Sequence, residues 1–332
     1  MRHYIQRLFI SALICFVAVP VFAQDPVLSR ILLIGDAGGN SAVTDALKAK
    51  MGLDSNTTVL FLGTEQAAEK TDISNDKILE INSGLLKETG ARGIFMPSEI
   101  SWDNGKPSGY EQIRKESEYI KGLNNPRIQI VPEKGCPGPE KIKLNEYTDL
   151  LIMDSQWWLH EYEKPEISSD CPEKNRMQLL NELEDKVSDS RDKLIIFASH
   201  HPLKSTGLRS GYFGLKQHIF PFTDLRGLHN AYIPLPVIGS LYPVVRGVFV
   251  SRQDMVHARY QDLIGSIDNI LNEHPHLLRV AGHEDILQLY REEGNNYIVS
   301  GYIVDDQTGL LVALGGVQHH LGGDLELTGG RG

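Results

Sequence analysis

The sequence has no excess of positive charge, and this absence limits the partners it can have. Lys and Arg total 33 against 43 Asp and Glu, which gives a formal net charge of −10 at pH 7. Binding nucleic acid through a surface requires a basic face that neutralises phosphates. We therefore expect no nucleic-acid partner, although a bound metal ion can still attract a phosphate group locally.

The chain also lacks an apolar run long enough to cross a bilayer, which takes about 20 residues. The apolar run over residues 8–19 is shorter, follows Arg2 and Arg7, and leads to small residues ending at Ala23. This pattern predicts a secretory signal peptide over residues 1–23. We expect the mature protein to be exported, periplasmic or secreted, with no transmembrane segment after signal cleavage.

Cysteine is scarce, with three in the chain, and Cys15 lies within the predicted signal peptide. Cys136 and Cys171 both lie in Pro-rich, loop-like stretches. Oxidation is the usual fate of such cysteines in an exported protein. We predict that Cys136 and Cys171 form a disulfide; the alternative is two unpaired thiols.

Short apolar runs, each followed by a small or polar residue, recur along the chain and are typical of buried strands. They cover residues 31–34, 59–62, 94–96, 150–153, 194–198 and 278–281. Helical patterns separate many of them, at residues 41–50, 77–89, 110–123, 175–187 and 253–272. The alternation predicts a layered α/β fold. Ligands of such folds collect at the carboxyl ends of strands, so we expect Asp36, Thr64, Ser98, His200 and His283 to lie near one another.

The remaining stretches predict two further strands, a long loop and a tail. Runs at residues 297–299 and 310–314 predict closing strands. Residues 203–249, rich in Gly, Pro and aromatics, predict a long loop over the strand ends. The Gly-rich residues 321–332 predict a tail or the start of a linker. The predicted organisation is thus a signal peptide (1–23), one main domain (24–320) and this tail.

The polar ends of the predicted strands carry the candidate chemistry. Residues 35–40 lack the G-x-G-x-x-G spacing of a dinucleotide site. Asp36 suits a metal carboxylate or, equally, a helix cap. A single histidine after a buried strand is more often structural. His200 and His283 together with Asp36, all at strand ends, instead favour a site of metal ligands or acid/base groups.

In this order the motifs resemble the calcineurin-like metallophosphoesterases. That family is marked by Gly-Asp-x-Gly, Gly-Asp-x-x, Gly-Asn-His-Asp/Glu, a strand-terminal His and Gly-His-x-His. The spacing matches over nearly the whole mature chain. The chain is similar to a secreted bacterial, purple-acid-phosphatase-like branch of the family through residues 102–105 (Trp-Asp-Asn-Gly), 135–140, 154–160 and 200–203.

The resemblance implies a four-layer fold, in which two mixed β-sheets pack as a sandwich and are flanked by helices. It also implies two metals at the strand ends, bridged by one carboxylate, that promote in-line attack on phosphorus. Asp36 matches the carboxylate of the first metal, and His200 and His283 match ligands of the second. Asp285 stands where the family has the last histidine, and a carboxylate can replace that ligand.

The sequence departs from the family at the residues that matter most for turnover. Thr64 stands where the metal-bridging aspartate belongs, so two adjacent cations would lack a shared anion. Ile100 occupies the position of the catalytic histidine and can neither ligate a metal nor transfer a proton. The family's asparagine ligand is Glu99 here. No catalytic residue of the family is therefore intact in this sequence.

Neighbouring side chains offer a partial replacement. Glu65 and Glu99 are further candidate ligands, the alternative being two ordinary solvated acids. With them we expect one divalent ion, Fe, Mn or Zn, rather than two. His201 and Arg209 are the expected phosphate contacts.

Three functions remain open from the sequence. The first is an exported, metal-dependent phosphoester hydrolase, weak or inactive because of Thr64 and Ile100. The second is a non-catalytic pseudoenzyme of the same fold, which binds a phosphorylated small molecule or a protein partner. The third is a domain that only adds stability to an export assembly.

Overall fold

All six apolar runs predicted as buried strands form strands in the computed structural model. The model describes residues 27–35, 41–63, 75–211, 219–220, 232–235, 251–284, 286–292, 295–303, 311–320 and 325–331. The six are β1 (Val27–Ile34), β2 (Thr57–Phe61), β3 (Arg92–Phe95), β6 (Thr148–Met153), β7 (Leu194–Ser199) and β8 (Leu277–Ala281). The predicted closing strands are present as β10 (Asn295–Val299) and β12 (Leu311–His320). Unpredicted strands are β4 (Ile128–Ile130), β5 (Glu140–Lys143), β9 (Gln288–Glu292), β11 (Tyr302–Ile303) and β13 (Leu325–Arg331).

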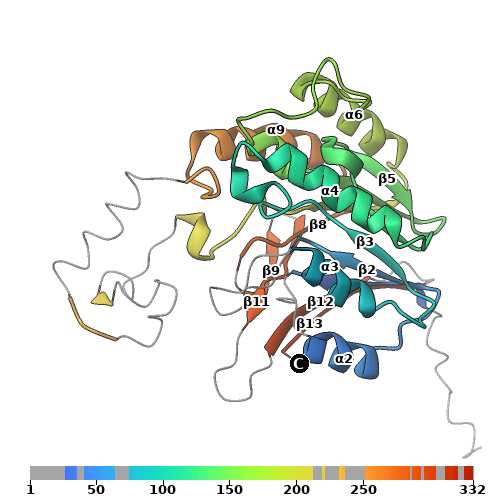
Figure 1. The fold of residues 1–332 in the computed structure, drawn as a ribbon. Coiled ribbons are helices and arrows are strands. Elements are labelled where there is room, and N and C mark those ends of the chain that lie inside the picture. Colours follow the sequence, from blue (N-terminus) through green and yellow to red (C-terminus); the bar gives the residue numbers. More distant parts are fainter. Residues whose placement is uncertain are drawn as a thin grey trace, which may run out of the picture.

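These strands form two mixed sheets (Figure 1). The first sheet has the order β11-β12-β1-β2-β3-β4, with β13 paired to β12, and β1 to β4 run parallel in it. The second has the order β5-β6-β7-β8-β10-β9, with β6, β7, β8 and β10 parallel. In both sheets, antiparallel strands lie outside the parallel ones. The carboxyl ends of the parallel strands therefore form a shared edge in each sheet.

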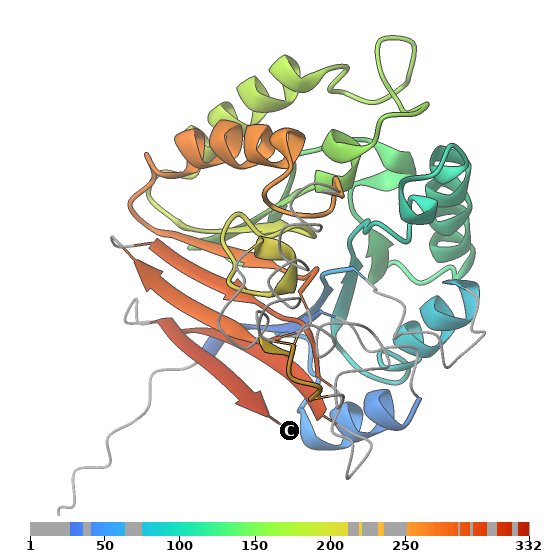
Figure 2. The same cartoon turned by 90° about the vertical axis from the view of Figure 1, so that its left-hand side faces the viewer.

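Helices flank the sheets. They are α2 (Ser41–Lys50), α3 (Asn75–Gly84), α4 (Gly109–Gly122), α5 (Ser155–Leu159), α6 (Arg176–Asp189) and α9 (Ala258–Leu271). Helix α6 begins after Asn175, whose side chain accepts a hydrogen bond from the backbone N–H of Gln178 at 3.0 Å and so caps the helix. In Figure 2, α9 lies over strands of the second sheet.

The core consists of two layers that follow the two-residue alternation of the strands. Leu33, Leu60 and Ile94 of the first sheet form one buried cluster with Ile196 and Val280 of the second. The residues next to them in the strands point the other way and pack with the helices, in a cluster that contains Leu32, Val59, Leu79, Ile113, Phe197 and Leu263. The two sheets thus pack face to face, and helices cover their outer faces.

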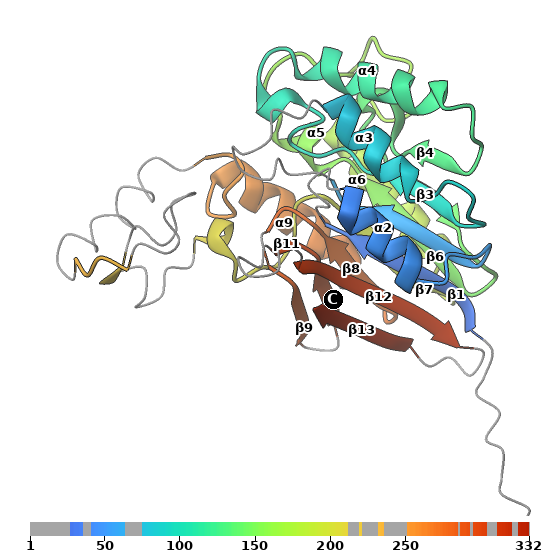
Figure 3. The same ribbon diagram turned by 60° about the horizontal axis from the view of Figure 1, so that its bottom comes forward.

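The carboxyl-terminal residues correct one prediction. Residues 325–331, predicted as part of a Gly-rich tail or linker, form β13, which pairs antiparallel with β12 (Figure 3). Residues 325–328 (Leu-Glu-Leu-Thr) alternate apolar and polar side chains, and this strand pattern outweighs the glycines that follow. The predicted signal peptide, 1–23, and most of the predicted loop over residues 203–249 lie outside the described residues.

A disulfide joins Cys136 and Cys171, as predicted, and closes a loop across 35 positions of sequence. Cys136 follows the short turn η2 (Glu133–Gly135), and Cys171 precedes α6. This bond is compatible with export, because oxidising compartments are where such bonds persist. None of the helices in the described part of the chain combines the length and apolar character that crossing a membrane requires.

The carboxyl groups of Asp154 and Glu116 are buried in the fold. Asp154 caps α5, accepting hydrogen bonds from the Trp157 backbone at 3.0 Å and from Trp102 Nε1 at 2.9 Å. Glu116, on α4, is 6% exposed. Burial raises the pKa of both carboxyl groups to about 7. Between the ordinary pKa values, 3.8 for Asp154 and 4.5 for Glu116, and about 7, the folded protein holds protons that the unfolded chain has already released.

The raised pKa of Glu116 predicts a specific pH dependence of stability. Between the ordinary pKa of 4.5 and about 7, the folded state binds the extra proton, so this group lowers stability as pH rises through the window. Glu116→Gln is expected to increase the free energy of unfolding at pH 8 by about 1–3 kcal/mol and to have little effect at pH 4.5. Urea unfolding at both pH values measures this. The exposed Glu118→Gln on the same helix is the control, and an equal effect of Glu116→Gln at both pH values would refute the assignment.

Removing the disulfide is expected to cost about 3–4 kcal/mol of unfolding free energy, because the bond restricts the unfolded chain over a loop of this length. The double variant Cys136→Ser/Cys171→Ser should unfold at a lower urea concentration than the oxidised wild type. Wild type treated with reductant should approach the variant. An unchanged midpoint would contradict this role of the bond.

Candidate functional site

The site forms where the parallel strands of both sheets end. His200 and His201 follow β7 directly, and His283 follows β8 after Gly282, on the neighbouring parallel strand. The Nδ1 atom of His200 lies 2.8 Å from the carbonyl oxygen of Leu62, which follows β2 in the other sheet. The two sheets therefore meet at this edge through a side chain that the sequence predicted to belong to the site.

Gly63 allows this close approach. Its φ of +106° lies in the left-handed region, and a Cβ atom there would be 2.3 Å from His200 Nδ1. A larger residue would displace the ring. The second predicted motif thus supplies a backbone turn that accommodates a histidine of the opposite sheet. Thr64 and Glu65, which follow in that motif, lie outside the described residues.

The hydrogen bonds of His200 and His283 determine which ring nitrogens are acceptors. His200 Nδ1 bonds to the Leu62 carbonyl, and His283 Nε2 lies 2.8 Å from the carbonyl of Gln253. A carbonyl only accepts, so these two nitrogens carry the protons, and His200 Nε2 and His283 Nδ1 are the acceptors. The two acceptor nitrogens face each other at 3.4 Å.

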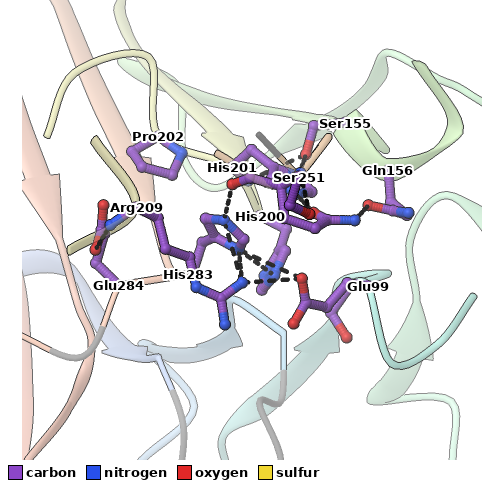
Figure 4. A network of polar contacts seen from close by, with 12 residues as sticks. Glu99, Ser155, Gln156, His200, His201, Pro202, Arg209, Ser251, His283 and Glu284 are labelled. Atoms are coloured by element: carbon purple, nitrogen blue, oxygen red, sulfur yellow. Dashed lines mark hydrogen bonds and ion pairs between the residues drawn. The ribbon is translucent and has the colours of Figure 1, made fainter. Parts of the chain in front are cut away.

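Glu99 and Arg209 complete the centre (Figure 4). The Glu99 carboxylate lies 3.9 Å from His283 Nδ1. Arg209 donates to Glu99 Oε2 at 3.0 Å, and the same nitrogen is 3.4 Å from His283 Nδ1. Arg209 is on the short turn η3 (Leu208–Ser210), where the buried Glu284 accepts from its backbone N–H at 3.4 Å. The guanidinium thus contacts the carboxylate and the His283 ring, and His200 Nε2 lies on the other side of His283 Nδ1 at 3.4 Å.

The histidines of this centre are neutral. Burial lowers the pKa of His200 to about 4, against an opposing effect of Glu99. Burial also lowers the pKa of His283 well below its usual range, and the Arg209 guanidinium lowers it further. Neutral imidazole is the form that binds metal ions. The neutral imidazoles of His200 and His283, with the Glu99 carboxylate beside them, are therefore groups that could hold a metal ion.

His201 has a different role from its neighbours. The ring nitrogens of His200, His201 and His283 lie within 4.8 Å of one another and could together hold a metal ion. However, both ring nitrogens of His201 already have partners, Ser155 Oγ at 2.8 Å and Gln253 Oε1 at 2.5 Å. This leaves no ring nitrogen of His201 for the predicted phosphate contact. His201 therefore positions the loop that carries Gln253.

The third motif of the resemblance covers residues 98–101, and three of these four residues are buried. Ser98 and Ser101 are buried and hydrogen-bonded, with the Ser98 backbone N–H donating to Ser101 Oγ at 3.2 Å. Ile100, at the expected position of the family's catalytic histidine, is 4% exposed. Glu99, between them, reaches the centre. The candidate ligands Asp36 and Asp285 lie outside the described residues, so their positions stay predictions.

Two further residues contribute to the site but were not predicted to belong to it. Gln253 bonds His201, 52 residues away along the chain, through its side chain. It also bonds His283, 30 residues away, through its backbone carbonyl. Ser155 holds the other nitrogen of His201. Ser155 lies within residues 154–160, one of the stretches that carry the family resemblance, so the sequence offered a reason to consider it. Gln253 lies in no such motif.

Comparisons with known proteins add little to this geometry. No family model matches the chain, and no curated protein matches it. Among solved structures, one titled "GAP50 the anchor in the inner membrane complex of Plasmodium" is 12% identical, with a TM-score of 0.49. The alignment covers 92% of this chain and 85% of that one. A likeness of this extent supports no inference about what this chain does.

Proposed function

We propose that this chain is an exported relative of the calcineurin-like metallophosphoesterases that binds one divalent cation and, through it, a phosphate ester, with weak or no turnover. One observation carries the proposal. The acceptor nitrogens of His200 and His283 face each other at 3.4 Å, and the Glu99 carboxylate lies beside them. Acceptors that converge in this way are stabilised by a cation between them.

Each ligand is held in place by the folded chain. The Leu62 and Gln253 carbonyls hold the protonated nitrogens of His200 and His283, which fixes the tautomer that ligates. All three ligand groups follow strands, so the sheets determine their spacing. Such prior orientation lowers the entropy lost when an ion binds. A bound divalent ion would supply Lewis acidity toward a phosphoryl oxygen.

Turnover is expected to be weak for two reasons that involve the chain's own residues. Ile100 is buried and cannot give a proton to a leaving oxygen, a role worth about 10²–10⁴ in rate. His201, the nearest other imidazole, is engaged by Ser155 and Gln253 on both nitrogens. Thr64 also carries no charge with which to bridge a second ion. The described centre thus offers ligands without an acid to complete the reaction.

A second candidate is a pseudoenzyme that binds a phosphorylated ligand without any metal. The Arg209 guanidinium supports it, because it contacts Glu99 at 3.0 Å within the same centre. A guanidinium can hold a phosphate group through paired hydrogen bonds. The two candidates differ in whether the positive charge that meets the phosphate belongs to an ion or to Arg209.

Metal binding tests the first candidate directly. The mature protein, dialysed against trace Zn²⁺ or Mn²⁺ and then against buffer, should retain about one ion per chain by mass spectrometry. His200→Ala and His283→Ala should each lose it, because each removes one of two imidazole ligands. The control is His276→Ala, which changes an exposed histidine. Retention of two ions, or of none, would count against a single-ion site.

Hydrolysis of an aryl phosphate monoester and diester, with each metal added, tests the expected weakness of turnover. Wild type should be no faster than His200→Ala. Substantial hydrolysis that His200→Ala abolishes would show that Ile100 and Thr64 do not disable the site.

Arg209 is expected to compete with the metal ion, because like charges a few ångströms apart repel by several kcal/mol at a partly buried site. Arg209→Ala should therefore tighten Zn²⁺ or Mn²⁺ binding at least about tenfold. Isothermal titration calorimetry measures this, with Arg291→Ala, on the edge strand β9, as the control. Weaker metal binding in Arg209→Ala would instead mean that Arg209 supports the site by holding Glu99 in place.

A further inference from the structure

Glu116, on α4, is a buried carboxyl group that is not among the candidate ligands; 6% of the residue is exposed. The charged groups that act on it are the carboxyl groups of Asp154 and Asp76, which repel its negative charge rather than compensate it. Removing a charge from water without a cation beside it lowers stability. Proteins keep residues that lower stability mainly where function requires them, so this position favours a functional role for Glu116.

The Ser101 side chain forms a hydrogen bond with the Glu116 carboxyl group. This bond opposes the upward shift that burial gives the pKa of Glu116, so it favours the ionised form, and the Ser101 hydroxyl is its donor. The Ser101 oxygen in turn accepts from the Ser98 backbone N–H at 3.2 Å and lies 3.4 Å from the Ser98 hydroxyl. All three residues are buried, so a continuous chain of hydrogen bonds joins α4 to Ser98.

The turn between Ser98 and Ser101 carries Glu99. The Ser101 backbone N–H also donates to the Ser98 hydroxyl oxygen at 3.4 Å, so the two serines close the turn from both ends. The Glu99 carbonyl accepts from the Asn104 backbone N–H at 2.7 Å. These bonds set the direction in which the Glu99 side chain leaves the turn, and its carboxylate lies 3.9 Å from His283 Nδ1. A group that holds Ser101 therefore also holds a candidate ligand.

We propose that Glu116 is a positioning residue of the candidate metal site: by accepting from Ser101, it holds the turn in the form that directs the Glu99 carboxylate toward His283. The inference rests on the proposed function, in which Glu99 is one of the ligands. An ionised carboxyl group suits this role because it only accepts hydrogen bonds. The Ser101 hydroxyl then has to donate to it, which leaves the lone pairs of Ser101 for the Ser98 N–H.

The Zn²⁺ affinity of three variants at pH 8, measured by competition with a chelating dye, tests the proposal. Glu116→Met keeps a side chain of similar length without an acceptor. It should weaken Zn²⁺ binding at least about fivefold, because the Ser101 hydroxyl loses its charged partner. Glu116→Gln keeps an acceptor oxygen and should stay within about twofold of wild type. Ser117→Ala is the control, because it removes a buried hydroxyl of the same helix that bonds the Lys134 backbone at 2.9 Å instead of the turn.

A second background separates positioning from a general loss of stability. In Glu99→Ala, which lacks the carboxylate ligand, adding Glu116→Met should not change Zn²⁺ affinity further, because coupled residues do not have additive effects. Glu116→Met should also unfold at no lower urea concentration than wild type at pH 8, since it removes a buried charge. Equal weakening in both backgrounds, or wild-type affinity of Glu116→Met, would overturn the proposal.

Hydrogen exchange of the metal-free protein separates a failure of this inference from a failure of the proposed function. In Glu116→Met, the amides of Ser98 and Asn104 should exchange at least about tenfold faster than in wild type, because the turn opens more often. Glu116→Gln should restore the wild-type rates, and the Lys134 amide should be unchanged in both variants. If this pattern appears while wild type binds no Zn²⁺, the positioning of the turn stands and the metal site fails. If wild type binds Zn²⁺ while Glu116→Met changes neither these amides nor the affinity, the metal site stands and the role of Glu116 is overturned.

Discussion

The hydrogen bond between the His200 ring and the carbonyl of Leu62 is the contact on which the rest of the site depends. It joins the end of β7 to the end of β2, and so joins the two sheets at the edge where their parallel strands terminate. It also fixes the proton on Nδ1 and leaves Nε2 facing His283. Gly63 is required beside it, because any Cβ atom there would collide with the ring. The packing of the two sheets, which brings the Leu62 carbonyl to the His200 ring, thus determines the tautomer of this candidate ligand.

In the resulting centre, two imidazole acceptors and the Glu99 carboxylate accompany one described positive charge, that of Arg209. Arg209 bonds Glu99 closely, at 3.0 Å, and approaches the His283 ring less closely, at 3.4 Å. A divalent ion at the same place would interact with both rings and the carboxylate more strongly, at the cost of repelling the guanidinium. Gln253 extends this arrangement, since its side chain bonds His201 and its backbone carbonyl bonds His283.

The sequence predicted the parts of the fold that depend on continuous burial. Runs such as residues 150–153 and 195–198 are apolar on both faces, and both lie in buried strands. Strands β5 and β9 escaped prediction because they lie at the sheet edges with mostly exposed or half-exposed residues, which removes the apolar signal. The proximity of His200 and His283 followed from their positions after neighbouring parallel strands. Arg209 was among the predicted site residues. Its contacts with Glu99 and His283, and those of Gln253, could not be predicted, because both residues lie in the connection between β7 and α9 rather than at the end of a strand.

The central claim is that His200, His283 and Glu99 together make a site for a single cation. X-ray diffraction from crystals of the mature protein soaked in Zn²⁺, with data collected on both sides of the zinc absorption edge, locates such an ion directly. We predict one anomalous peak within about 2.0–2.2 Å of His200 Nε2, His283 Nδ1 and a Glu99 oxygen, with the Arg209 guanidinium moved away from it. Two peaks about 3.5–4 Å apart, or a single peak bound through His201 instead, would contradict it.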